Sequence, residues 1–65
     1  MSENLTRPEL IAEIRRVATE METLGAAMDY YGGFNSTISD HGKEMIGAAQ
    51  IARGWATGME EQEND

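Results

Sequence analysis

The chain has 65 residues and a net charge of −7, from 12 acidic and five basic residues, with no cysteine and one histidine. This length permits one small domain, whose hydrophobic core is modest and which no disulfide reinforces. One histidine without any thiol also argues against a structural metal site. We therefore expect self-association into a homo-oligomer to supply the missing stability.

The acidic balance disfavours binding to nucleic acid polymers and to membranes, because both generally need a basic surface. Four of the acids fall in the last six residues, so the rest of the chain is only mildly acidic. A small phosphate-bearing ligand remains compatible, since arginines of several subunits can converge on it. No secretory signal and no membrane-spanning run is present, and together with the absence of cysteine this predicts a cytoplasmic protein.

The first predicted helix covers residues 8–31 and follows a flexible N-terminus with a helix cap at residues 1–7. Thr6 and Glu9 have the spacing of a capping box, and Pro8 is compatible with a first helical turn. Large apolar residues then recur at alternating spacings of four and three, which is a heptad pattern. This first seam consists of Leu10, Ile14, Val17, Met21, Leu24, Met28 and Tyr31.

A turn at residues 32–37 and a second helix at residues 38–58 follow. Gly32 and Gly33 favour a helix end, because glycine readily adopts the left-handed conformation of a C-terminal cap. The alternative N-caps of the second helix are Asn35, Ser36, Thr37 and Ser39. The second seam consists of Ile38, His41, Met45, Ala48, Ala52, Trp55 and Met59. Residues 59–65 are predicted to form a disordered acidic tail.

Matching seams on two helices predict an all-α fold. We expect a two-helix antiparallel hairpin that assembles through these heptad-like seams into a homo-oligomeric helical bundle. Interior glycines such as Gly42, Gly47 and Gly54 each cost about 1 kcal/mol relative to alanine. Close packing of helices or close approach of a ligand would offset that cost. Gly25 in the first helix indicates either a close helix approach or a bend.

Catalysis is not indicated. The chain offers no nucleophile with a base and an orienting group, and no metal-ligand or phosphate-loop motif. We therefore expect a non-enzymatic protein without a metal or another cofactor. The single histidine, His41, is expected to be a seam or surface residue, and Trp55 a core residue.

A few side chains are candidates for ligand binding. Tyr30 and Tyr31 lie near the hairpin tip, where a ring either closes the core or stacks on a base. Lys43 and Arg53 are ten residues apart, and so lie within about 80° of each other around the helix axis. Arg53 either binds a phosphate or pairs with an acid of a neighbouring subunit. Gly47 lies between them.

The stretch Lys43-Glu-Met-Ile-Gly-Ala-Ala-Gln-Ile-Ala-Arg-Gly-Trp55 resembles the second helix of small phage anti-defence proteins, the helical-hairpin sponges that act against the CBASS and Thoeris immune systems. In that family a glycine is followed by small and apolar residues and, six positions later, by an arginine. Gly47 and Arg53 have this spacing. Residues 10–16 resemble the family's amphipathic first helix, whereas the extended N-terminal segment and the final proline of some members are absent.

This resemblance implies an oligomeric, non-catalytic phage protein of the host cytoplasm that sequesters a cyclic oligonucleotide or cyclic ADP-ribose-type immune signal. It also implies that Arg53 and Lys43 bind phosphate, that Tyr30 or Tyr31 stacks on a base, and that Gly47 permits close approach. Two alternatives stay open. One is a small acidic inhibitor or adaptor that binds a host protein, and the other is a purely structural oligomerisation module.

Overall fold

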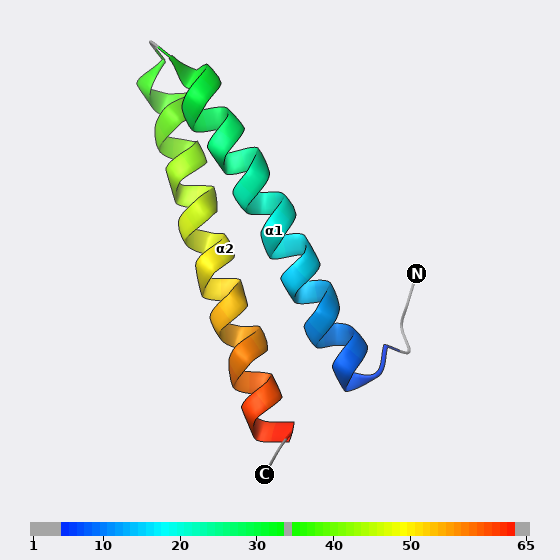
Figure 1. Cartoon of the computed structure of the whole chain (residues 1–65). Coiled ribbons are helices and arrows are strands. Elements are labelled where there is room, and N and C mark those ends of the chain that lie inside the picture. Colours follow the sequence, from blue (N-terminus) through cyan, green and yellow to red (C-terminus); the bar gives the residue numbers. More distant parts are fainter. Residues whose placement is uncertain (1–4, 34, 64–65) are drawn as a thin grey trace.

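The computed structural model describes residues 5–33 and 35–63. Two α-helices, α1 (Arg7–Gly32) and α2 (Ser36–Glu63), lie side by side and antiparallel (Figure 1). This arrangement confirms the predicted all-α hairpin. The molecule measures 48 × 26 × 12 Å, so it is about one helix thick. Neither helix, over the residues described, is long and apolar enough to cross a membrane.

The predicted capping box begins α1. The hydroxyl of Thr6 accepts a hydrogen bond from the amide of Glu9, and the carboxylate of Glu9 accepts one from the amide of Thr6 at 2.9 Å. Two amides that the helix leaves unpaired are satisfied in this way. The other end of α1 is closed by Gly33, whose φ of 50° favours glycine. Both predicted boundaries of the first helix therefore hold to within a residue.

The second helix is longer than predicted. Asn35 is the N-cap, since its side-chain oxygen accepts from the amide of Ile38 at 3.2 Å. The helix continues to Glu63, which corrects the predicted end at Gly58 and, for residues 59–63, the predicted disordered tail at residues 59–65. A glycine that caps a helix C-terminus usually has a positive φ. Within the described segments only Gly33 has one, so Gly58 does not act as a cap. Residues 1–4, 34 and 64–65, which include parts of the predicted termini and turn, lie outside the described residues.

Contacts with α1 explain why the last turns of α2 are helical. The guanidinium of Arg7 donates to the carbonyl oxygen of Met59 at 3.3 Å and to the side-chain oxygen of Gln62 at 3.0 Å. Arg15 donates two hydrogen bonds to the carboxylate of Glu60. These bonds join residues 45 to 55 positions apart in the chain, so they tie the end of α2 to the start of α1.

The two helices touch along small residues at intervals of seven. This contact stripe consists of Ile11, Ala18, Gly25 and Gly32 on α1 and Gly42, Ala49 and Ala56 on α2, all of them buried. Close approach of the backbones is greatest between two glycines. A Cβ atom on Gly25 would lie 2.6 Å from the carbonyl oxygen of Gly42, and one on Gly42 would lie 2.5 Å from that of Gly25. Of the two explanations for Gly25, close approach is therefore the one observed.

The seams themselves do not form this contact. No residue of either seam is buried within a single chain, and Trp55 is 64% exposed. The expectation that Trp55 is a core residue therefore does not hold for one chain. The physical reason is that the smaller heptad residues allow the helices to come closer than large seam residues would, so the seams are displaced to one side of the contact.

The contact stripe predicts opposite effects for two glycine-to-alanine changes. Gly42→Ala places a methyl group against backbone atoms and should lower the free energy of unfolding by about 1–3 kcal/mol. The matched control Gly54→Ala meets no atom within 4 Å, and should raise it by up to about 1 kcal/mol through helix propensity. Urea denaturation followed by circular dichroism, at one fixed protein concentration, measures both. Equal effects of the two changes would contradict the close contact.

Candidate functional site

One edge of the hairpin is polar. Arg15, Glu22 and Asp29 follow one another at intervals of seven on α1, each four residues after a member of the contact stripe. Side chains of α2 bind them across the helix contact: Glu60 binds Arg15, Arg53 binds Glu22, and the hydroxyl of Ser39 donates to Asp29. This polar edge locks the register of the two helices, because a shift of either helix would break all three contacts together.

Arg53 has the most extensive contacts of the polar edge. Its guanidinium lies 2.6 Å from a carboxylate oxygen of Glu22 and donates to the hydroxyl of Thr19 at 2.8 Å. The hydrogen bond from Arg53 lowers the pKa of Glu22, and the reciprocal bond raises the pKa of Arg53. Hydrogen bonding from Arg15 similarly lowers the pKa of Glu60. The side chains of Arg53 and Glu22 are about one-third exposed, so the pair is partly screened by water.

The opposite edge of the hairpin is apolar. The two seams lie side by side there, and together we call them the apolar face. Its most exposed large aliphatic residue is Leu24, at 54%, and Tyr31 is 81% exposed at the tip. A contiguous apolar surface of this kind is uncommon on a soluble monomer and typically marks a site of interaction.

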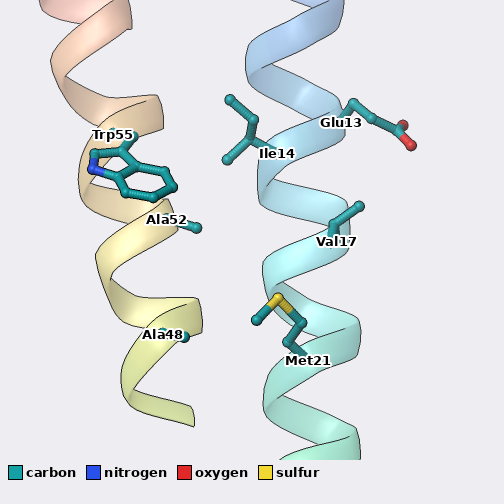
Figure 2. Close-up of a pocket in the computed structure, with 7 residues that line it drawn as sticks. All are labelled: Glu13, Ile14, Val17, Met21, Ala48, Ala52 and Trp55. Carbon is teal, nitrogen blue, oxygen red and sulfur yellow. The ribbon is translucent and has the colours of Figure 1, made fainter. Parts of the chain in front are cut away.

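A hollow of about 430 Å³ lies in the middle of the apolar face, between the two helices. Its floor includes Ala48 and Ala52, and Trp55 forms a wall (Figure 2). Three larger apolar residues of α1 complete it: Ile14, Val17 and Met21. Glu13 is its one charged lining residue, and Figure 2 shows its carboxylate directed away from the hollow. The hollow is therefore suited to an apolar group rather than to a phosphate.

The predicted ligand residues do not form one cluster. Arg53 belongs to the polar edge and pairs with Glu22 of its own chain. Its predicted pairing with a phosphate or with an acid of a neighbouring subunit stays a prediction. Lys43 is exposed and makes no hydrogen bond or ion pair with another described residue. Gly47 follows it by one turn, with open space where a Cβ would be. These two therefore remain available to a ligand.

Tyr30 and Tyr31 lie near the tip of the hairpin, at the end of α1. They are 77% and 81% exposed, and their rings make an edge-to-face contact with centroids 4.9 Å apart. Within a single chain, Tyr31 therefore does not close the end of a core. Stacking on a base, the other predicted use of these rings, remains a prediction.

Sequence analysis missed the partners of Arg53 and the hollow. The heptad pattern of the sequence contains the information to predict both. Glu22 follows Arg15 by seven residues and Glu60 follows Arg53 by seven, so charges of opposite sign alternate beside the contact stripe in both helices. The hollow follows from two alanines, Ala48 and Ala52, at successive positions of a seam that otherwise carries mostly larger side chains.

Comparison of the chain with protein-family models, with curated proteins and with solved structures finds no match. Within residues 5–33 and 35–63, no group of three or more histidine or acidic side chains is placed to hold a metal ion. Nor is any polar or charged side chain of residues 5–33 and 35–62 buried. The function must therefore be inferred from the two edges of the hairpin.

The polar edge predicts that acid weakens the fold. Because the folded-state pKa values of Glu22 and Glu60 are lowered from 4.5, their stabilisation is present above that pH and is lost as the pH falls through the folded-state values. Glu22→Gln should therefore reduce the fall in melting temperature between about pH 5 and pH 3. The control is Glu61→Gln, since Glu61 has no hydrogen bond or ion pair to any residue the structure describes. Identical acid profiles for the two variants would contradict this assignment.

Proposed function

We propose that this chain is a non-catalytic assembly module, which self-associates through its apolar face into a homo-oligomeric helical bundle. The observation that carries this proposal is the open apolar face, built from seven seam residues on each helix. A hairpin is a single layer of helices, whereas stable domains bury their apolar residues between two layers. A second copy supplies the missing layer.

The exposed area of the chain is compatible with this proposal. The chain exposes 4877 Å², whereas a compact monomer of 7.2 kDa exposes about 4100 Å². The excess of roughly 800 Å² is the area that each partner buries in a protein interface of standard size. The chain forms a flat hairpin of 48 × 26 × 12 Å, so its shape leaves enough exposed area for an interface with another copy.

The distribution of charge also supports self-association. Copies with a net charge of −7 repel one another, so an interface between them must exclude acidic residues. The apolar face contains no acidic or basic residue apart from His41. The two ion pairs that join the helices, Arg15–Glu60 and Arg53–Glu22, lie on the polar edge, on the other side of the contact stripe. A face-to-face arrangement therefore brings no carboxylates of the two seams together.

Val17→Glu tests this proposal, because Val17 lines the hollow at the centre of the apolar face. We expect sedimentation velocity to show the wild-type chain at twice 7.2 kDa or more at high concentration, and Val17→Glu at the monomer mass. Ile51→Glu is the matched control: Ile51 is an exposed β-branched residue, 58% accessible, that belongs to neither seam. It should associate like the wild type. A wild-type chain that stays monomeric at every concentration would overturn the proposal.

The second candidate is sequestration of a cyclic nucleotide signal by the assembled protein. Lys43 and Gly47 favour it. Lys43 has no hydrogen bond or ion pair to another residue that the structure describes, and one helical turn later a Cβ on Gly47 would meet no atom within 4 Å. An oligomer multiplies such sites, which makes dense local positive charge compatible with an acidic chain. Binding without chemistry then acts by mass action on the free signal.

Retention of cyclic dinucleotides, cyclic trinucleotides and cyclic ADP-ribose isomers tests this candidate. The protein is incubated with the panel, filtered and heat-denatured, and the released compounds are identified by chromatography. We expect one class to be released intact, with binding weakened by Lys43→Ala and retained by Lys43→Arg. Arg53→Ala is a poorer test, because it also breaks the contact with Glu22. Absence of every compound from the denatured fraction would eliminate this candidate.

A further inference from the structure

The largest side chain of the apolar face has few contacts within its own chain. Trp55 is 64% exposed and stands at the wall of the central hollow, whose floor is formed by alanines (Figure 2). We propose that Trp55 is the principal anchor between copies, and that its indole becomes buried against the apolar face of a second copy. This inference rests on the proposed self-association and names the residue that carries it.

Size and position support this assignment. An indole side chain buries on the order of 150–250 Å² when it is enclosed, which is a large share of the roughly 800 Å² that one copy contributes to a standard interface. Residues that dominate the energy of an interface are enriched in tryptophan and lie near its centre. The hollow beside Trp55 is lined by Val17 and Met21, which lie near the middle of α1 (Arg7–Gly32).

We assign a second copy of the chain as the partner of the apolar face, because this face carries both a protruding ring and a hollow that could receive one. It has a large protruding ring, at Trp55, and an open volume of about 430 Å³ beside that ring. In a twofold interface the same surface appears on both sides, so one contact of this kind covers the ring and fills the hollow of each copy. The near absence of charge around both features permits this contact between two acidic chains.

Trp55 is the only tryptophan in the chain, so the intrinsic tryptophan fluorescence reports on this residue alone. The fluorescence of the wild-type protein is recorded at concentrations from fully associated to dissociated, as fixed by sedimentation. We expect the emission maximum to move to longer wavelength on dilution, and acrylamide to quench the dissociated form more strongly. This measurement needs no substitution, so it does not depend on any variant folding.

Two substitutions then measure the contribution of the anchor. Trp55→Ala should weaken association by roughly 30-fold or more, the loss expected of a dominant interface residue. Ile51→Ala removes a similarly exposed apolar side chain, 58% against 64% for Trp55, from outside the apolar face and should leave association unchanged. Circular dichroism verifies that both variants remain helical.

The outcomes separate this inference from the proposal beneath it. If the wild-type chain does not associate, the proposed function fails and the anchor fails with it. If the chain associates while the emission and quenching of Trp55 stay unchanged on dilution, self-association stands and the anchor is wrong. The second result would also mean that the hollow beside Trp55 remains open in the oligomer to another apolar group.

Discussion

The approach of two backbones at Gly25 and Gly42 is the constraint on which the rest of the hairpin depends. Neither position has room for a Cβ atom, and Ala18 with Ala49 continues the same close contact along the helices. Helices held this close cannot place leucine, methionine or tryptophan between them. The large apolar residues are therefore displaced from the contact, even though burial of these residues normally supplies most of the energy of a small fold.

This displacement makes the two edges of the hairpin chemically different. The heptad positions on one side of the contact stripe carry the pairs Arg15–Glu60 and Arg53–Glu22, and those on the other side carry the two seams. The polar edge fixes register and is already satisfied within one chain. The large side chains of the apolar face remain exposed within one chain, and the proposed association would bury them. The exposure of Trp55 is a consequence of the same geometry.

The sequence predicted the helices well because their signals are local. The capping box at Thr6 and the glycine stop at Gly33 both depend on neighbouring residues. Gly58 misled the prediction of the second helix end, because the bonds that keep the last turns helical come from the distant residues Arg7 and Arg15. Tertiary contacts of this kind leave no local pattern.

The heptad spacing of the seams is also clear in the sequence, but the sequence does not show which surface the seams pack against. The sequence predicts that the large apolar residues assemble hairpins into an oligomer, but it does not show that the weaker repeat of small residues forms the contact between the two helices of one hairpin. Each helix has two heptad repeats that could form the contact, one of large apolar residues and one of small residues. Hydrophobicity favours the repeat of large residues, whereas close backbone packing favours the repeat of small ones. Local pattern does not decide between them, since the choice depends on how closely the backbones pack. For the same reason Arg53 was separated from Glu22, its partner across the contact.

The most direct test of this account is an isotope-filtered nuclear Overhauser experiment on a mixture of labelled and unlabelled full-length chains. Such an experiment detects contacts between copies only. We expect cross-peaks between copies at the methyl groups of Val17 and Met21, at the centre of the apolar face, and none at Ile51. Cross-peaks confined to Ile51, or none at any methyl group of a chain that sediments as a monomer, would contradict the central claim that the apolar face is an interface between copies.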